Sequence, residues 1–193
     1  MILGITGGTG CGKTTLLKEI EARGGLILDC DAIYHELLTR DMELLNAISD
    51  RFPGVVVEKK LERKKLGAIV FADPQALADL NAITHGAIKA EIVRRLAENP
   101  PLAAIDAIAL FEGGLAQLCD ATVAVCAPRE ARVERLMKRD QISREYAEKR
   151  INAQKDEAWF RQMCSYTLEN TGTAEEFREK CAAFLEHVRP SSC

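Results

Sequence analysis

Short apolar runs of strand length alternate along the chain with stretches whose apolar residues recur at helical spacing. Residues 1–6 form an apolar run that suits a buried strand. Leu16, Leu17 and Ile20 then repeat as the buried face of a helix requires, and the glycine pair at 24–25 ends that helix. A second apolar run follows at 26–28. The order strand, loop, helix, strand predicts an α/β fold.

Helical spacing then continues from about residue 35 to residue 100. The valines at 55–57 are the one candidate for a short strand in this region. We therefore expect a helical insert between strands of the sheet. The apolar positions that define it are Leu37, Leu38, Leu44, Leu45, Ile48, Leu66, Ile69, Val70, Leu77, Leu80, Ile83, Ile88, Ile92, Val93 and Leu96.

The last third of the chain returns to short apolar runs. An amphipathic helix at 174–187 closes it, and 190–193 is expected to be a frayed tail. The pattern predicts a three-layer α/β/α fold, with a five-stranded parallel sheet and helices on both faces, as in the P-loop families. The predicted strands are 1–6, 26–28, 102–111, 121–126 and 166–168.

Composition narrows the class of protein. The chain has 193 residues, of which 47% are hydrophobic and 28% charged, which suits one globular domain with inserts. The net charge of −3 and the lack of a basic tract argue against nucleic acid as a partner. No apolar run is long enough to span a membrane, and a strand that begins at Met1 leaves no room for a signal peptide. Seven scattered cysteines without a C-x-x-C pair favour a reduced, cytoplasmic protein without a zinc site. The oligomeric state stays open, with a monomer favoured.

Residues 7–14 read Gly-Gly-Thr-Gly-Cys-Gly-Lys-Thr, the phosphate-binding loop pattern G-x-x-x-x-G-K-[ST]. Its glycines let the backbone turn tightly and direct several N–H groups to one point. The helix that follows adds its positive dipole end. Lys13 can bring charge to the β- and γ-phosphates, and Thr14 can offer a hydroxyl to Mg²⁺. The strand before the loop and the helix after it match the context that this mechanism needs, so the loop predicts nucleotide binding.

Two carboxylates follow the second strand. Asp29 and Asp31 lie at its carboxyl end, where open α/β sheets bind ligands. Asp31 can act as a general base, and it can also cap the helix that follows. Asp106 interrupts the strand at 102–111, where a charge is costly unless paired, and is a candidate to orient Mg²⁺ through water. Glu112 is the second candidate, and a salt bridge or a cap explains either residue equally well.

A third group of candidate residues follows Pro128, which opens a helix. Arg132, Arg135 and Arg139 share one face of this helix and would suit triphosphate charge, although such a stripe is usually only solvated. Ser143 can cap a further helix, which carries Arg150 and Gln154 on one face. A short charged helix pair of this kind can close over ATP and exclude water. In the insert, basic residues could meet an anionic acceptor, and a solvated helix face is an equally good interpretation: Lys59, Lys60, Arg63, Lys64 and Lys65.

Several stretches together resemble the dephospho-coenzyme A kinase family, and the resemblance covers nearly the whole chain. The stretch 6–14 looks like the family's T-G-G-I-G-S-G-K-S, and Asp29-Cys30-Asp31 looks like its D-A-D. The loop alone is generic, whereas D-x-D, F-E and R-I-x-x-Q in this order are much more specific. The other matching stretches are Leu61–Arg63, Val70–Pro74, Ile83–His85, Asp106–Glu112, Arg139-Asp140, Arg150-Ile151 with Gln154, and Asn170 with Gly172.

The resemblance implies transfer of the γ-phosphoryl group of ATP to the 3′-hydroxyl of the dephospho-coenzyme A ribose, the last step of coenzyme A synthesis. ATP and dephospho-coenzyme A are then the partners, with Mg²⁺ as cofactor. It also implies three parts. These are a nucleotide-binding core at 1–34, 101–137 and 159–193, a helical acceptor-binding insert at 35–100, and a lid at 138–158.

The motif and the resemblance together imply a set of site residues. Asp31 serves as base, with Lys13 and Arg139 in catalysis. The acceptor is bound by Asp31, Arg63 and His85, although spacing alone favours a structural role for His85. The metal is held by Thr14 and, through water, by Asp106. ATP is bound by Gly8, Thr9, Gly10, Cys11, Gly12, Lys13, Thr14, Thr15, Arg135, Arg150 and Asn170.

The chain departs from the family pattern at four positions. Gly86 and Ile108 stand where the family usually has proline, and both lie near the acceptor side. Cys11 replaces a serine of the loop but still has a backbone N–H, and Ser165 stands where an aspartate is common. Two other functions remain open: a small-molecule kinase with a nucleoside or nucleotide acceptor, and a non-catalytic nucleotide sensor. Retention of Lys13, Thr14, Asp31 and the lid arginines argues against the sensor.

Overall fold

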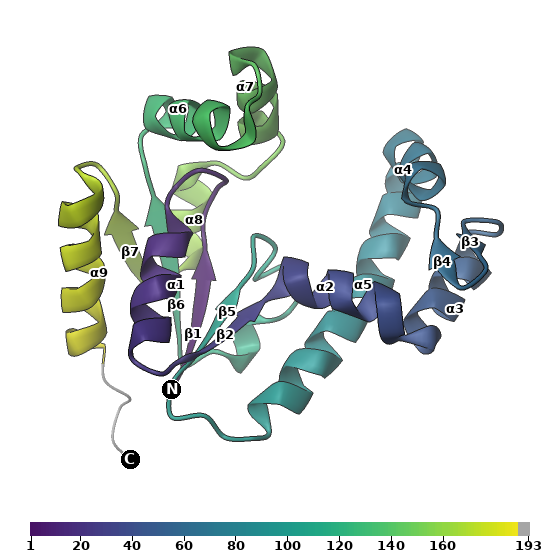
Figure 1. Cartoon of the computed structure of the whole chain (residues 1–193), viewed down its shortest axis with the longest axis horizontal. Helices are drawn as coiled ribbons and strands as arrows, with labels where there is room; N and C mark the ends of the chain where they lie inside the picture. The colour runs from purple at the N-terminus through teal and green to yellow at the C-terminus, as the bar shows by residue number, and fades with distance from the viewer. Residues whose placement is uncertain (189–193) are drawn as a thin grey trace. The chain divides into compact units, whose positions relative to one another are not determined.

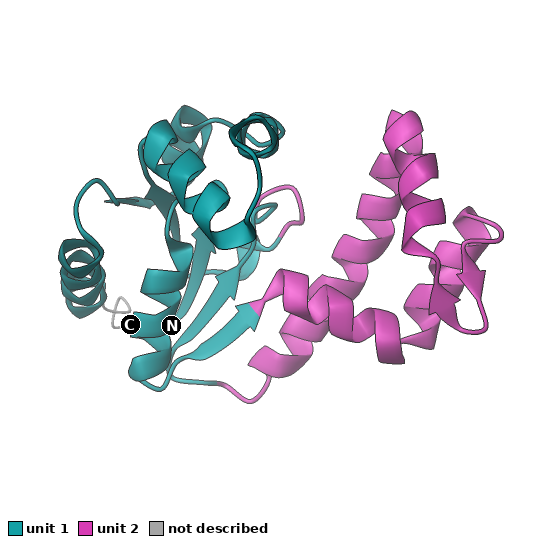
Figure 2. Ribbon diagram, turned by 45° about the horizontal axis from the view of Figure 1, so that its top comes forward, with its two compact units in different colours: residues 1–28, 100–110, 115–193 teal, residues 29–99, 111–114 magenta. Residues whose placement is uncertain are grey.

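The computed structural model describes residues 1–188, so the predicted tail at 190–193 lies outside the described residues. The chain divides into two compact units. Unit 1 comprises residues 1–28, 100–110 and 115 onward, and unit 2 comprises 29–99 and 111–114 (Figure 2). No helix in the described residues is both long and apolar enough to cross a membrane. Among the described cysteines, those with a free thiol include Cys11, Cys119, Cys126, Cys164 and Cys181.

Unit 1 contains the five-stranded sheet, in the order β2-β5-β1-β6-β7 (Figure 1). β1 lies in the centre and pairs in parallel with β5 and β6, and β6 pairs in parallel with β7. The predicted five-stranded α/β fold is confirmed. The strands are β1 Ile2–Thr6, β2 Leu26–Asp29, β5 Ala103–Asp106, β6 Ala121–Cys126 and β7 Tyr166–Glu169.

Helices cover both faces of this sheet because successive strand residues point to opposite sides. On β6, Val123 and Val125 join the core that includes α1 (Lys13–Ala22) and α9 (Ala174–His187). Ala124 and Cys126 face the other way and pack with Phe160 of α8 (Glu157–Met163). The alternation along one strand therefore produces the three layers.

The predicted strand at 102–111 is too long. β5 ends at Asp106, and the next residues turn back on themselves. Leu110 is completely buried, and its carbonyl accepts hydrogen bonds from the amides of Leu115 and Ala116. The apolar character of 107–110 thus reflects a buried turn, which periodicity cannot distinguish from a strand. The segment ends in the short 3₁₀ helix η1 (Ala116–Leu118).

Two further helices of unit 1 pack on each other. α6 (Arg129–Asp140) and α7 (Arg144–Asn152) share a small core formed by Val133, Leu136, Ala147 and Ile151. The predicted cap of α7 is confirmed, because the Ser143 hydroxyl accepts a hydrogen bond from the Tyr146 amide. The pair is therefore a folded element with its own apolar contacts.

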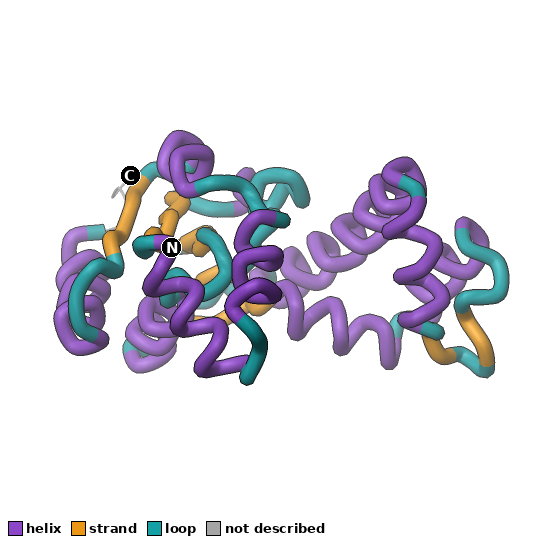
Figure 3. Tube along the Cα trace, turned by 90° about the horizontal axis from the view of Figure 1, so that it is seen from above, coloured by secondary structure: helices purple, strands orange, loops and turns teal. Residues whose placement is uncertain are grey.

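Unit 2 is mostly helical, with one small hairpin (Figure 3). The buried apolar side chains of its helices include Leu37, Leu45, Ile48 and Ile92. The predicted short strand at 55–57 is present as β3 (Val56–Val57), which pairs antiparallel with β4 (Lys60–Leu61). The helices are α2 Cys30–Arg40, α3 Met42–Arg51, α4 Arg63–Ala72 and α5 Pro74–Leu96.

Candidate active site

The phosphate-binding loop connects β1 to α1. Gly12 caps α1 in the left-handed region, with φ of 103°. A Cβ atom there would also lie 2.3 Å from Asn170 Nδ2, so only glycine fits this position. The first turn of α1 carries no acidic side chain. The positive end of the helix dipole therefore remains available to an anion.

Lys13 and Thr14 begin α1 and have different surroundings. Lys13 is half-buried, and its Nζ donates a hydrogen bond to the Gly7 carbonyl at 3.1 Å. Its charge is therefore held beside the loop. Thr14 is exposed, and the amide of Thr15 donates to the Gly12 carbonyl at 3.0 Å. The Thr14 hydroxyl is accessible to an incoming ligand.

Asn170 and Arg135 hold the loop from outside. Asn170 is buried, and its Nδ2 donates to the Cys11 carbonyl at 2.8 Å. Its Oδ1 accepts from Arg135 Nη2 at 3.2 Å. The Nη1 of Arg135 also donates to the Gly10 carbonyl at 3.2 Å. Both side chains therefore support loop carbonyls, which the sequence alone did not indicate.

The Cys11 thiol has a structural place in the loop. Burial raises its pKa, and the nearby Lys13 opposes this effect. The Cys11 amide donates to the Gly8 carbonyl at 3.3 Å, within the loop itself. The side chain is a neutral, packed thiol.

Two other candidate residues hold Thr9, and contact with the loop was predicted for neither of them. Arg132 Nε donates to the Thr9 carbonyl at 2.9 Å. The Thr9 amide donates to Gln154 Oε1 at 2.8 Å. The prediction that Arg132 could form part of a solvated stripe is wrong, because its side chain is buried. A signal exists in the sequence, because the spacing places each of these residues on a helix face shared with arginines.

Asp140 joins the two arginines at the ends of α6 and α7. Its carboxylate accepts from Arg139 Nε at 2.7 Å and from Arg150 Nη1 at 2.5 Å. Hydrogen bonds from Arg139, and also from Arg150, lower the pKa of Asp140 to about 2. The shared carboxylate holds the two guanidinium groups close together.

Asp29, and not Asp31, caps α2. Asp29 is the last residue of β2, and its Oδ1 accepts from the amides of Asp31 and Ala32 at 2.9 and 3.0 Å. The interpretation of Asp31 as the helix cap is therefore wrong. The physical reason is that the extended backbone of Asp29 ends the strand and lets its carboxylate reach the first free amides of the helix. The side chain of Asp31 is exposed in the first turn.

The other predicted acceptor residues also lie in unit 2. Arg63 Nη2 lies 3.2 Å from His35 Nδ1, and His35 is exposed one helical turn after Asp31. Burial lowers the pKa of His85, and the nearby Glu112 partly opposes this shift. The structure thus places Arg63 beside α2 and His85 near Glu112.

The predicted metal ligands have suitable chemistry. Asp106 ends β5 in register with Ile5 of β1, the strand that leads into the loop and Thr14. A carboxylate and a hydroxyl are the hard oxygen ligands that Mg²⁺ accepts. No cluster of three or more His, Cys, Asp or Glu side chains suited to a metal occurs among residues 1–188. Mg²⁺ commonly needs only one or two protein oxygens beside nucleotide phosphates, so the residues present fit this ion.

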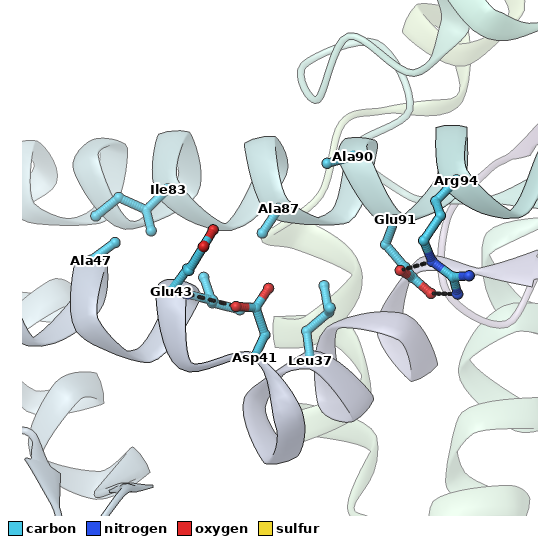
Figure 4. Close-up of a pocket in the computed structure, with 10 residues that line it drawn as sticks. Leu37, Asp41, Glu43, Ala47, Ile83, Ala87, Ala90, Glu91 and Arg94 are labelled. Carbon is cyan, nitrogen blue, oxygen red and sulfur yellow. Dashed lines mark hydrogen bonds and ion pairs between the residues drawn. The ribbon is translucent and has the colours of Figure 1, made fainter.

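Two of the cavities in unit 2 differ in charge. The first, of about 360 Å³, lies among α2, α3 and α5, with acidic side chains Asp41, Glu43 and Glu91 at its edge (Figure 4). Arg94 also lines it and is bound to Glu91. Its remaining lining is mostly alanine and leucine. An anionic ligand is disfavoured there.

The second cavity, of about 380 Å³, lies beside the hairpin β3–β4. Lys59, Lys60 and Arg63 contribute positive charge to it, against the single carboxylate of Glu58. Glu58 and Lys59 form the hairpin turn, with left-handed φ angles of 48° and 62°. This cavity, in contrast to the first, suits an anionic group.

Comparisons with known proteins agree with this arrangement. The family model described as dephospho-CoA kinase matches residues 1–176. A dephospho-CoA kinase of Anaeromyxobacter dehalogenans is 37% identical, over 97% of this chain and 92% of its own length. One of Latilactobacillus sakei is 35% identical, over 96% of this chain and 95% of its own length.

Solved structures extend the likeness. A Thermus thermophilus protein has a TM-score of 0.81 at 34% identity, with 98% of each chain covered. Dephospho-CoA kinase from Campylobacter jejuni has a TM-score of 0.68 at 27% identity, over 97% of this chain and 96% of its own. A shikimate kinase of Bacteroides thetaiotaomicron, at 14% identity and a TM-score of 0.59, shares the fold alone. The phosphate-binding loop, the parallel sheet and the whole-length match together show that this chain belongs to the dephospho-CoA kinase family.

Proposed function

We propose that this chain transfers the γ-phosphoryl group of ATP to the 3′-hydroxyl of dephospho-coenzyme A, which yields coenzyme A and ADP. One observation carries the proposal. The family match runs from residue 1 to residue 176 and therefore includes both the nucleotide loop and the whole helical unit. A match confined to the loop would support only a P-loop kinase of unspecified acceptor.

The nucleotide binds at the loop in this proposal. Backbone amides of the loop that have no partner within it cradle the phosphates, and Lys13 neutralises charge on the β- and γ-phosphates. Arg139 and Arg150 add positive charge from the α6–α7 end of unit 1. Because phosphoryl transfer depends mainly on positioning and charge stabilisation, these residues would supply most of the rate enhancement. Asn170 and Arg135 act on the nucleotide through the loop that they hold.

Mg²⁺ is the cofactor of the proposed reaction. The Thr14 hydroxyl would hold it directly, and the Asp106 carboxylate would hold it through water. When bound, the ion neutralises charge on the phosphate oxygens of ATP. Glu112 is assigned to the acceptor unit in this proposal, because its negative charge acts on His85 and raises the pKa of that side chain against the effect of burial.

Asp31 is the proposed general base. A ribose hydroxyl is a weak nucleophile at neutral pH, and a carboxylate that accepts its proton assists attack on phosphorus. The capping role of Asp29 supports this assignment, because the exposed carboxylate of Asp31 is then not needed as the cap of α2. In this proposal Asp29 stabilises the start of α2, and Asp31 accepts the proton of the acceptor hydroxyl.

The acceptor pyrophosphate is proposed to bind beside Arg63. The charge of the two cavities in unit 2 supports this choice, because the cavity with Arg63 and two lysines is basic and the other is acidic. His85 would contact the acceptor on the side near Glu112. In this proposal residues 35–100 bind the acceptor, residues 138–158 act as the lid, and 1–34, 101–137 and 159–193 form the nucleotide core.

A direct assay tests the proposal. Purified protein is incubated with Mg-ATP and dephospho-coenzyme A, and coenzyme A and ADP are quantified. Parallel reactions use adenosine, AMP and shikimate as acceptors. We expect stoichiometric products with dephospho-coenzyme A alone. Preferential turnover of another acceptor would support a different small-molecule kinase, and ATP binding without turnover would support the nucleotide sensor.

A further inference from the structure

Thr9 is held on both sides of its backbone by side chains that are distant in sequence. The residue is buried. Its carbonyl accepts from Arg132, 123 positions away, at 2.9 Å. Its amide donates to Gln154, 145 positions away, at 2.8 Å. Two such hydrogen bonds form only if the elements that carry Arg132 and Gln154 have a fixed position relative to the loop.

Arg132 lies in direct contact with the loop. A Cβ atom on Gly8 would lie 2.2 Å from Arg132 Nη2, and one on Gly10 would lie 2.9 Å from the Arg132 carbonyl. Within the described residues, Nη2 is buried without a hydrogen-bond partner. Burial lowers the pKa of Arg132. The guanidinium therefore packs against the loop, donates to the Thr9 carbonyl and is shielded from solvent.

Gln154 has a fixed position as well. Its amide donates to the Ile151 carbonyl at 3.2 Å, which continues the end of α7. Ile151 belongs to the small core that fastens α7 onto α6, together with Val133 and Leu136. The position of the α6–α7 pair therefore determines where the side chain of Gln154 meets the loop.

The contacts at Thr9 leave later amides of the loop for a ligand. Within residues 1–188, the amides of Gly10, Gly12 and Thr14 donate to no protein acceptor, whereas the Thr9 amide donates to Gln154. Convergent amides bind phosphate well only if the backbone is held rigidly beforehand. The two peptide groups of Thr9 directly precede these amides in the loop, so holding them restrains the positions of the amides.

We propose that Arg132 and Gln154 are positioning residues for nucleotide binding: they clamp the backbone of Thr9 so that the later loop amides converge on the phosphates. The inference rests on the proposed use of ATP. It differs from a role in charge neutralisation, because Arg132 acts through a carbonyl and Gln154 carries no charge. The clamp couples the α6–α7 pair to the loop through two hydrogen bonds.

Gln154→Leu tests the clamp, because it removes the acceptor and keeps the bulk of the side chain. The matched control is Gln162→Leu, at an exposed glutamine of α8 that forms no hydrogen bond with the loop. We expect the KM for ATP and the Kd for ADP to rise on the order of tenfold in Gln154→Leu, as for loss of one partly buried hydrogen bond. The kcat at saturating ATP and the KM for the acceptor should stay within about twofold. The control should match the parent.

Hydrogen exchange at the Thr9 amide separates the clamp from the proposed function. We expect the amide to be protected in the parent and in Gln162→Leu, and to exchange on the order of ten times faster in Gln154→Leu. Exchange and ADP affinity need no turnover, so a parent without kinase activity would overturn the proposed function and leave the clamp measurable. Unchanged ADP affinity together with retained protection of Thr9 in Gln154→Leu would overturn the clamp. A fall in kcat with unchanged nucleotide affinity would also overturn it.

Discussion

The Asn170 side chain donates a hydrogen bond to the carbonyl of Cys11 at 2.8 Å, across 159 positions of sequence. Asn170 follows β7, whereas Cys11 belongs to the loop after β1. The same side chain accepts from Arg135 of α6. One buried amide therefore connects three segments around the nucleotide loop. This role needs a donor and an acceptor on a single side chain, which asparagine provides.

The first prediction is that Asn170→Asp destabilises the protein. The variant keeps an acceptor for Arg135 but places a carboxylate oxygen against the Cys11 carbonyl, which leaves a buried acceptor pair without a proton. We expect a loss of about 1–3 kcal/mol, which corresponds to a fall in Tm of roughly 2–4 °C per kcal/mol for a chain of this size. Thermal melting measures it. Asn152→Asp, at an exposed asparagine that bonds to Arg129, is the control and should melt like the parent.

The second prediction concerns Lys13→Ala. The side chain makes one hydrogen bond to the Gly7 carbonyl, so its loss should leave the melting temperature nearly unchanged. Turnover should fall roughly 10³-fold, because charge stabilisation is the main catalytic contribution in phosphoryl transfer. Steady-state kinetics with Mg-ATP and dephospho-coenzyme A provide the measurement. Lys18→Ala, at an exposed lysine of the same helix, should have the parent's rate. A near-normal rate in Lys13→Ala would remove the lysine from the mechanism.

The third prediction separates the two aspartates that follow β2. Asp31→Asn should lower kcat by about 10²–10⁴ with unchanged stability, because it removes a base from an exposed position. Asp29→Ala should instead lower the free energy of unfolding by about 1 kcal/mol, because it removes the cap of α2. Kinetics and thermal melting of both variants distinguish the roles. If Asp31→Asn turned over normally, the base would have to be sought elsewhere.

The fourth prediction concerns the carboxylate shared by Arg139 and Arg150. Asp140→Asn should raise the KM for ATP, because the two guanidinium groups lose the anion that holds them together. Stability should change little, since exposed ion pairs contribute little. Arg139→Ala and Arg150→Ala should each lower kcat over KM for ATP. Glu148→Gln, which disturbs only an exposed pair with Arg144, is the control. Unfolding of either arginine variant would show that it is a structural residue.

The fifth prediction is a pH dependence from Glu91. This buried carboxylate accepts from Arg40, Arg94 and Arg95. Hydrogen bonds from Arg94, and then from Arg95, lower its pKa from 4.5 to about 2 in spite of burial. Since the folded-state pKa lies below the unfolded value, the stabilisation is fully present above about pH 4.5 and is lost as the pH falls toward 2.

Thermal melting of Glu91→Gln across this range checks the fifth prediction. The parent should be more stable than the variant at neutral pH, and the difference in Tm should shrink as the pH falls below 4.5. Glu43→Gln, at an exposed glutamate, should follow the parent at every pH. A difference in Tm that is independent of pH would show that packing, and not ionisation, determines the contribution of Glu91.

Local patterns were enough to predict the elements that depend on nearby residues. The loop at 7–14 follows from glycine conformations and from the lysine that begins α1, all within one stretch of chain. The five-stranded sheet follows from short apolar runs, and the Ser143 cap follows from its position before a helix. These features involve contacts between neighbours in sequence or a periodicity that a buried face imposes. The sequence therefore determined the fold class and the family.

Features that depend on long-range packing were decided only by the tertiary structure. β5 ends at Asp106 because Leu110 turns back into the core, and apolar character alone does not reveal a turn. Asp29 caps α2 in place of Asp31 because the strand ends one residue later than periodicity suggests. Arg132, Arg135, Gln154 and Asn170 meet the loop from more than a hundred positions away. The partner of a side chain depends on where the sheet and helices place its backbone. A local sequence pattern does not contain the distance in space between residues that are far apart in the chain.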